Sequence, residues 1–178
     1  IEPYFHRVYP HNDSSVHALG YVSRMNKKDK ASYDKDNYSG TLFVGKVGIE
    51  KQYESLLHGQ TGLKQIERNV SGRVIDTQIV TPAIPGQDLY LSLDLDMQKK
   101  AEELLKGKRG AIVVVDTRNG EVLTLVSTPV YNPNWFVNGI SHANYKLLQS
   151  SKDIPQLNRT VQGLSPPAST IKPMVALA

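Results

Sequence analysis

The chain has 178 residues, and 39% of them are hydrophobic, so it can bury a core and is not an intrinsically disordered chain. Its net charge of +4 is mild, and its basic residues are mixed with acidic ones, as in residues 27–30. This balance suits an anionic surrounding such as a lipid surface or an anionic polymer, and it gives no sign of a nucleic-acid partner. The absence of cysteine excludes disulfides, thiolate metal sites and a cysteine nucleophile, and it is compatible with the bacterial periplasm.

The first 80 residues are polar and rich in turns, and their apolar residues fall in short runs. Strand-like patterns occur at 17–23, 63–70 and 73–80. Residues 26–40 contain few hydrophobic residues, and we expect a mobile loop there.

A short helix is expected over residues 48–57, where apolar residues recur at the spacing of one helical face. These residues are Ile49, Tyr53, Leu56 and Leu57. Gly59 is placed to end this helix.

The segment 81–86 contains two prolines and one glycine, which interrupt a helix or a central strand. We therefore divide the chain into a first part, residues 1–85, and a second part, residues 86–178. The sequence mixes strand and helix patterns along both parts, which predicts the α+β class.

The second part begins with leucines that alternate over residues 89–93, as they would in a strand. Asp94 is a good N-cap for a helix over 95–106. Its expected apolar face consists of Met97, Ala101, Leu104 and Leu105.

Two apolar strands are expected at 111–115 and 122–126, joined through the turn residues 117–120. The Asn-Gly pair in that turn is a strong hairpin signal. Because both strands are almost entirely apolar, we expect the sheet to be covered on both faces. Ser141 is placed to cap a further short helix that runs through Leu148.

Near the end of the chain, Ser169 and Lys172 stand three residues apart after a Pro166-Pro167 turn. On a helix this spacing places the hydroxyl and the amine on one face. A neutral amine can remove the proton of a serine hydroxyl and make it a nucleophile, and burial near a helix N-terminus favours the neutral form of a lysine. The alternative is that Ser169 is only an N-cap and Lys172 is exposed to solvent. A second Ser-x-x-Lys pattern, Ser32 to Lys35, lies in the polar loop, and we interpret it as chance.

Three longer motifs decide between these readings: His17 to Ser23, Gly45 to Gly62, and Asn158 to Pro173. They are similar to the patterns H-x-x-G-Y-V-S, G-K-x-G-I-E-x-x-Y-E-x-x-L-H-G-Q-T-G and N-R-x-x-Q-G-x-x-P-P-G-S-T-x-K-P. In these motifs and in the hairpin from Gly110 to Pro133, the chain resembles the class B penicillin-binding proteins. Within that class it resembles the penicillin-binding protein 2 group, which belongs to the cell-elongation machinery.

The resemblance implies that residues 1–85 belong to a β-rich, non-catalytic pedestal. Residues 86–178 would begin a transpeptidase domain with an antiparallel sheet and helices. It also implies that Ser169 is the acyl-accepting nucleophile and Lys172 its base, in a peptidoglycan D,D-transpeptidase that β-lactams acylate. The expected partners are stem peptides, a SEDS-type glycosyltransferase and a rod-shape scaffold protein, with no cofactor. The expected location is the periplasmic side of the bacterial inner membrane.

The chain departs from this family in two ways. Ala168 stands where the family usually has glycine, which carries a cost of about 1 kcal/mol or more if that position has positive φ. The S-x-N and K-T-G motifs of the active site would lie beyond Ala178, so the chain carries half a site. Because it starts at Ile1 and stops within an expected helix, we expect a fragment of a protein whose membrane anchor precedes Ile1.

Three alternatives remain open at this point. The chain could serve as an interaction module whose catalytic domain is vestigial or regulatory. It could come from a β-lactam sensor or a serine β-lactamase, which share S-x-x-K but are not expected to have the Gly45–Gly62 pattern. It could also belong to the division homologue of the same class, although residues 58–62 and 132–141 favour elongation.

Overall fold

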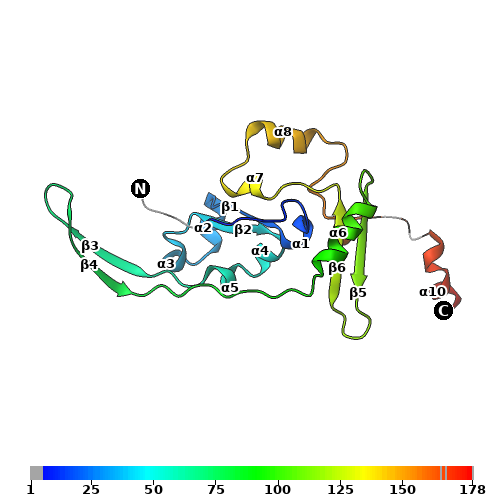
Figure 1. Cartoon of the computed structure of the whole chain (residues 1–178), viewed down its shortest axis with the longest axis horizontal. Helices are drawn as coiled ribbons and strands as arrows, with labels where there is room; N and C mark the ends of the chain where they lie inside the picture. Colours follow the sequence, from blue (N-terminus) through cyan, green and yellow to red (C-terminus); the bar gives the residue numbers. More distant parts are fainter. Residues whose placement is uncertain (1–5, 165, 167, 178) are drawn as a thin grey trace.

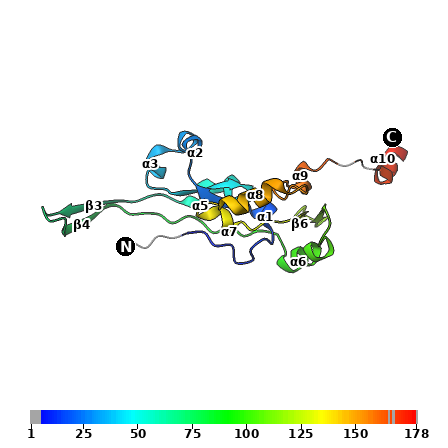
Figure 2. The same ribbon diagram turned by 90° about the horizontal axis from the view of Figure 1, so that it is seen from above.

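The structure is a computed structural model that describes residues 6–164, 166 and 168–177. Figures 1 and 2 show an elongated molecule in which one hairpin extends from one end and the last helix lies at the other. The body between them mixes short helices with two-stranded antiparallel sheets. This confirms the α+β class.

The strands of the described residues form three antiparallel pairs, β1 with β2, β3 with β4 and β5 with β6. In order they are β1 Tyr21–Arg24, β2 Phe43–Val47, β3 Leu63–Arg68, β4 Val74–Thr81, β5 Gly110–Val115 and β6 Val122–Thr128. Val22 is paired with Gly45 in the first sheet, Gln65 with Gln78 in the second and Val113 with Leu125 in the third.

The helices are short, and many begin with a side chain that caps the first turn. Those of the first part are α1 Val16–Leu19, α2 Lys27–Ser32, α3 Lys35–Tyr38, α4 Gly48–Gln52 and α5 Glu54–His58. Those of the second part are α6 Leu95–Leu104, α7 Asn134–Val137, α8 His142–Ser150, α9 Arg159–Gln162, the 3₁₀ helix η1 Ala168–Ile171 and α10 Lys172–Ala176. Within the described ranges, none of these helices is long and apolar enough to cross a membrane.

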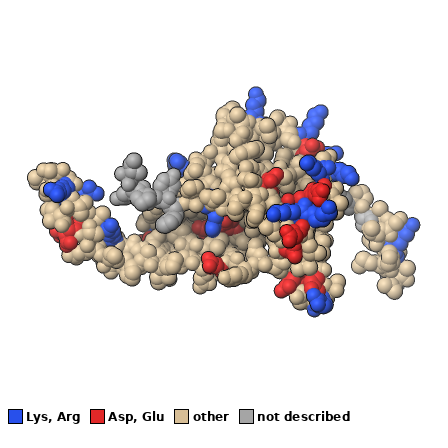
Figure 3. Space-filling view, viewed as in Figure 1, with Lys and Arg blue, Asp and Glu red and all other residues tan. Residues whose placement is uncertain are grey.

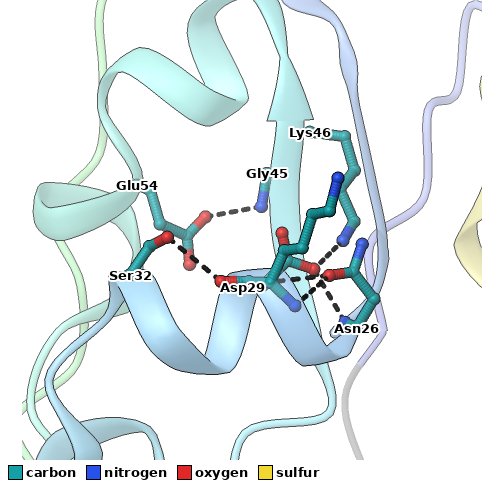
Figure 4. Close-up of polar contacts among 7 residues, drawn as sticks. Asn26, Asp29, Ser32, Gly45, Lys46 and Glu54 are labelled. Atoms are coloured by element: carbon teal, nitrogen blue, oxygen red, sulfur yellow. Dashed lines mark hydrogen bonds and ion pairs between the residues drawn. The ribbon is translucent and has the colours of Figure 1, made fainter.

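The polar segment 26–40, expected as a mobile loop, contains helices α2 and α3 instead. Asn26 caps α2 by accepting hydrogen bonds from the backbone N–H groups of Lys28 and Asp29. Asp29 accepts in return from the N–H of Asn26 and pairs with the Lys46 ammonium of β2, as Figure 4 shows. This reciprocal capping box is what a search for apolar periodicity overlooks. The Ser32 hydroxyl donates to the carbonyl of Lys28 within α2, whereas Lys35 belongs to the next helix, so the two residues of the second Ser-x-x-Lys pattern lie in different helices.

The helix expected over residues 48–57 is two helices, α4 and α5, that meet at Tyr53. Gly59 has φ 73° and follows α5, as predicted. The buried side chains of this pair are Glu50 and Glu54 and not the apolar set, because both carboxylates bind groups inside the fold. Residues 17–23 also differ from their expected strand, since α1 covers the first of them and the strand begins at Tyr21.

Close packing of β2 on α4 depends on Gly45. A Cβ atom at this position would lie 2.2 Å from the carbonyl oxygen of Glu50, so no side chain fits. The N–H of Gly45 donates to Glu54 over 2.7 Å, which Figure 4 also shows. This contact explains why the glycine and the glutamate stand together in the Gly45–Gly62 motif.

The strand expected over residues 89–93 does not form, because this extended segment has no ladder partner among the described residues. It is held beside β6 by two bonds, from the Ser92 hydroxyl to the Val122 carbonyl and from the Asp94 N–H to the Leu123 carbonyl. Asp94 caps α6 as predicted, accepting from the N–H groups of Asp96 and Met97.

The expected apolar face of α6 is wrong in part. Ala101 is buried, but Met97 and Leu104 are exposed, and Gln98 is the most deeply buried residue of the helix. The Gln98 amide donates to the carbonyl of Leu125 and accepts from its N–H, so it replaces a strand partner at the edge of β6. A side chain that pairs with the backbone in this way is not visible in a hydrophobic pattern.

The β5–β6 hairpin forms as predicted, and Ser141 caps α8 through the N–H of Asn144. The hairpin is covered on one face only, contrary to expectation, since Val113 and Val115 are 48% and 46% exposed. The reason is that α6 packs on the hairpin while alternate residues of β5 point away from the packed face. Strands β3 and β4 also form as predicted, and every residue in them is exposed.

The core is made jointly by both parts of the chain. One buried cluster combines Val16 of the first part with Tyr131, Phe136 and Leu148 of the second. A second cluster combines Tyr9 and Val22 with Val137. The division after residue 85 stays a prediction, and residues on its two sides share their apolar packing.

Candidate functional site

The candidate site is built outward from the end of β6, where Ser127 is 1% exposed. Its hydroxyl donates to the carbonyl of Leu157 over 3.1 Å and accepts from the N–H of Arg159 over 3.0 Å. One buried serine therefore joins the sheet to the start of α9, the last described helix before the Ser169 segment.

Asn158 begins α9 and makes contacts in two directions. Its side-chain oxygen accepts from the N–H of Thr160 at 3.1 Å, which caps the helix. Its side-chain nitrogen donates to the carbonyl of His17 at 3.0 Å, which lies in α1. The next residue, Arg159, donates from its guanidinium to backbone carbonyls of residues 153–157. Helix α9 is thus held by α1, by β6 and by the loop before it.

His17 is buried beside this junction. A ring nitrogen lies 3.3 Å from the carbonyl oxygen of Pro129, and the ring meets Tyr131 edge to face with centroids 5.5 Å apart. Burial lowers the pKa of His17 below its ordinary value, the bond to Pro129 opposes this, and the charge of Arg159 lowers it further. The surroundings of His17 in the fold therefore favour the neutral form of its imidazole.

Ser169 lies in η1 and Lys172 is the first residue of α10, so both sit at a helix start as predicted. Both side chains are exposed, and no hydrogen bond joins them among the described residues. Figure 1 places α10 away from the body of the molecule. Of the Pro166-Pro167 turn, Pro167 lies outside the described residues. The roles assigned to Ser169 and Lys172 stay predictions, since the amine of Lys172 is exposed in this structure and not buried.

Ala168, directly before Ser169, has φ 50°. This is the left-handed region, in which a Cβ atom is strained and glycine is not. The backbone of Ala168 therefore has the positive φ at which an alanine is expected to be strained relative to glycine.

A second polar cluster lies in the first part of the chain. The buried Glu50 carboxylate pairs with the guanidinium of Arg7 at 2.9 Å and accepts from the hydroxyl of Tyr9 at 3.1 Å. Burial raises the pKa of Glu54, although the hydrogen bond from Gly45 lowers it in part. Burial and the charge of Glu50 together raise the pKa of Tyr9. A cavity of about 300 Å³ lies beside both carboxylates. Because the Glu50 carboxylate is matched by a cation and a hydroxyl, we assign this cluster to the architecture of the first part.

Charge is spread over the molecule with no dominant sign. In the view of Figure 3, Lys and Arg side chains gather over the β3–β4 hairpin and around α6, with Asp and Glu side chains among them. A cavity of about 600 Å³ near α6 shows the same mixture, with Lys106, Lys108 and Arg109 beside Glu102, Glu103 and Asp153. In the described ranges, no group of three or more His, Asp or Glu side chains is placed to hold a metal ion.

Sequence reasoning found the Ser-x-x-Lys pair but missed the contacts that hold the start of α9, which come from the Ser127 hydroxyl, the His17 carbonyl and the donor role of Asn158. Asn158 and Arg159 were visible as part of the last motif. The contact between Asn158 and His17 spans 141 positions of the chain, and no local pattern could have revealed it.

Comparisons with known proteins give a consistent result. The family model described as "Penicillin-binding Protein dimerisation domain" matches residues 1–91, and "Penicillin binding protein transpeptidase domain" matches residues 110–178. The chain is 49% identical over 177 residues to "Peptidoglycan D,D-transpeptidase MrdA" of Acinetobacter baumannii, covering 99% of this chain. It spans 26% of the length of that relative.

Two solved structures are similar along nearly the whole chain. The crystal structure of Pseudomonas aeruginosa PBP2 in complex with WCK 5153 is 44% identical with a TM-score of 0.85, over 98% of this chain and 35% of that one. PBP2 of Helicobacter pylori in a complex with MreC is 41% identical with a TM-score of 0.84, over 97% of this chain and 32% of that one.

Proposed function

The chain belongs to the penicillin-binding proteins, and we propose that it is the nucleophile-bearing piece of a peptidoglycan D,D-transpeptidase that acts during cell elongation. The observation that carries this is the position of the Ser169-x-x-Lys172 pair within residues 110–178, the range that matches the transpeptidase model. Support for elongation comes from the relative named MrdA and from the two PBP2 structures.

In the proposed reaction, the Ser169 hydroxyl attacks the carbonyl carbon of the D-Ala–D-Ala amide in a stem peptide. The neutral amine of Lys172 takes the hydroxyl proton, and an oxyanion hole of backbone N–H groups stabilises the tetrahedral intermediate. Lys172 passes this proton to the nitrogen of the leaving D-Ala, and an ester remains on Ser169. The amine of a neighbouring strand then attacks the ester and loses a proton to Lys172, which returns it to the Ser169 oxygen as the cross-link forms. A β-lactam acylates the same oxygen when its ring amide opens. The proposal requires no cofactor.

We assign residues 1–85 to the pedestal and residues 86–178 to the start of the transpeptidase domain. The H. pylori PBP2 was solved with MreC, which supports a rod-shape scaffold protein as partner of the whole protein. A SEDS-type glycosyltransferase is the second proposed partner. The proposed location is the periplasmic side of the inner membrane, where the substrate lies.

Labelling with fluorescent penicillin tests the proposal. We expect covalent labelling of the whole natural protein that contains this chain, and loss of the label in its Ser169→Ala variant. Residues 1–178 alone should stay unlabelled, because the S-x-N and K-T-G motifs are absent from them. A Ser169→Ala protein that is still acylated would refute the assignment of the nucleophile.

The remaining alternatives differ in the fate of the adduct and in the role of the first part. A long-lived penicillin ester supports the transpeptidase, whereas rapid hydrolysis supports a β-lactamase. An interaction module would retain its elongation partners through the first part and would leave cell shape unchanged when Ser169 is replaced by alanine.

A further inference from the structure

We propose that the turn of the β3–β4 hairpin, residues 68–73, inserts into the surface of a bilayer that contains anionic lipids. The inference rests on the proposed location at the inner membrane and gives the first part of the chain a lipid partner there. The proposed reaction uses neither β3 nor β4, so the hairpin is a feature that the proposed function leaves unexplained.

The hairpin carries its turn away from the body of the molecule. Every residue of β3 and β4 is exposed. Figures 1 and 2 show the hairpin extending along the long axis, beyond the helices and sheets of the body. Because a strand rises about 3.3 Å per residue, the paired stretch of β3 spans about 20 Å. The turn can therefore touch a surface that the body does not reach.

Hydrogen bonds within the turn satisfy several of its own polar groups. The side-chain oxygen of Asn69 accepts from the N–H groups of Ser71 at 3.0 Å and Arg73 at 2.9 Å. The backbone N–H of Asn69 donates to the Arg73 carbonyl, and that of Gly72 donates to the Asn69 carbonyl. Polar groups that are already bonded lose less when they leave water, so these bonds lower the cost of entering a lipid surface.

Val70 is the apolar apex of this turn. Its side chain is fully exposed, so no other described residue covers it. A single exposed valine is ordinary on a protein surface, but this one stands at the end of a projecting hairpin between two arginines. Transfer of its side chain from water to the acyl boundary of a bilayer would favour insertion by about tenfold.

Arg68 and Arg73 flank the apex, and no acidic residue lies between them in the sequence. Among the residues that the structure describes, neither guanidinium is in an ion pair, and Arg68 donates to the Gly72 carbonyl at 3.2 Å. The nearest acidic residues, Glu67 and Asp76, lie opposite each other further back on the strands. Figure 3 shows Lys and Arg side chains gathered over this hairpin. Near an anionic membrane, each such charge favours binding by about fivefold.

An apolar apex between two guanidinium groups matches the layers of a bilayer surface. The valine would enter the acyl boundary while the guanidinium groups bind phosphates in the headgroup layer. A soluble anionic polymer could pair with the arginines but would offer nothing to Val70. We therefore assign an anionic lipid surface as the occupant of this turn.

The turn of the other exposed hairpin, β5–β6, provides a matched comparison. It also contains an arginine, Arg118, but the guanidinium pairs with the Asp116 carboxylate at 2.7 Å. Its residues 117–120 include no apolar side chain of the size of valine. In Figure 1 this hairpin runs across the long axis, so its turn does not lie at the end that β3–β4 occupies.

The test uses the whole natural protein, free of other cysteines, reconstituted into vesicles of phosphatidylcholine with or without phosphatidylglycerol. A Ser71→Cys variant carries an environment-sensitive fluorophore beside the intact apex, and lipids with a nitroxide on the upper acyl chain quench the inserted probe. We expect the ratio of inserted to free turn to be about twentyfold higher in the anionic vesicles, from two charges at about fivefold each. A probe at Thr117→Cys, in the β5–β6 turn, should not be quenched in either.

Substitutions separate the charge of the turn from its shape. Replacing both arginines by glutamine should lower the ratio in anionic vesicles by about twentyfold, whereas replacing both by lysine should keep most of it, because the charge remains. Val70→Ser should lower the ratio in the same vesicles, because the apex loses its apolar group. Arg118→Gln, the control, should leave the ratio unchanged.

Penicillin labelling of the same samples keeps this proposal apart from the proposed function. An unlabelled protein would refute the proposed function. A labelled protein whose Ser71 probe is not quenched in anionic vesicles would overturn the lipid contact and leave the function intact. Equal quenching in neutral vesicles, equal quenching at Thr117, or insertion that survives the two glutamine substitutions would also overturn it.

Discussion

Ala168 combines a left-handed backbone, φ 50°, with a side chain that disfavours it, directly before the proposed nucleophile. We predict that Ala168→Gly stabilises residues 168–177 by about 1 kcal/mol, because glycine adopts this conformation without strain. Hydrogen exchange of the amides in this segment should slow by about fivefold, since exchange reports local opening.

Ala143 is the control for this substitution, since it is exposed in α8 and has no positive φ. Ala143→Gly should have the opposite sign and speed exchange in its own helix, because glycine costs about 1 kcal/mol in a helix. Faster exchange in Ala168→Gly would show that the left-handed conformation carries no strain.

Thr124 is fully buried in β6, and its hydroxyl has no hydrogen-bond partner among the described residues. Such a hydroxyl costs free energy, whereas a methyl group of the same shape does not. We predict that Thr124→Val raises the free energy of unfolding by about 1 kcal/mol in urea titrations. Thr128→Val is the contrasting variant, because the Thr128 hydroxyl donates to the Lys108 carbonyl at 2.8 Å, and it should lower stability. Loss of stability in both variants would contradict the assignment of Thr124.

At the scale of elements, Asp94 decides where α6 begins. Its carboxylate accepts from the backbone N–H groups of Asp96 and Met97, both at 2.9 Å. We predict that Asp94→Ala lowers the free energy of unfolding by about 1 kcal/mol, and that Asp94→Asn, which keeps the acceptor, changes it by only a few tenths. Chemical denaturation of both variants checks this. An asparagine variant as unstable as the alanine variant would show that charge and not capping is responsible.

The elements that the sequence predicts well are those with local signals. The Asp94 cap, the Asn-Gly turn between β5 and β6 and the Ser141 cap each lie within a few residues of the element that they define. Apolar periodicity failed where polar side chains take the buried positions. On α6 the most buried position is taken by Gln98 and not by one of the expected apolar residues. On α5 the buried position is taken by Glu54.

The residues of the candidate site also fall into two groups, those that a local pattern reveals and those that only the fold brings together. The Ser169-x-x-Lys172 pair is a local pattern and could be found from the sequence. The residues that hold the segment before it are brought together by the fold, as in the bond from Asn158 to His17. A strand pattern at residues 89–93 was misleading for a related reason, since a strand requires a partner that the pattern does not specify.

For the molecule as a whole, the shared core predicts that the two parts unfold together. Val16, from the first part, packs with Phe136 and Leu148 of the second, and Trp135 packs against the same cluster. We predict that Val16→Ala lowers the free energy of unfolding by about 2 kcal/mol. Unfolding in urea can be followed by the fluorescence of Trp135, the only tryptophan in the sequence, and by far-UV circular dichroism. We expect the two signals to have the same midpoint.

Val70 gives the matched control, because it lies fully exposed at the end of the β3–β4 hairpin. Val70→Ala should leave the midpoint unchanged. Two separate transitions in the parent, with Val16→Ala shifting only one of them, would show that the parts have independent cores.

The junction of the two parts also predicts how stability depends on pH. Burial lowers the pKa of His17 in the folded state below its ordinary value of 6.5, so the unfolded chain binds this proton more readily than the folded one. Stability that is fully present above about pH 6.5 should therefore fall as the pH decreases toward the folded pKa. His17→Gln, which cannot be protonated, should show a smaller loss in acid, measured by urea unfolding at a series of pH values. His142→Gln, at an exposed position in α8, should keep the loss of the parent. If His17→Gln destabilises as steeply in acid as the parent, the acid sensitivity arises from groups outside this junction.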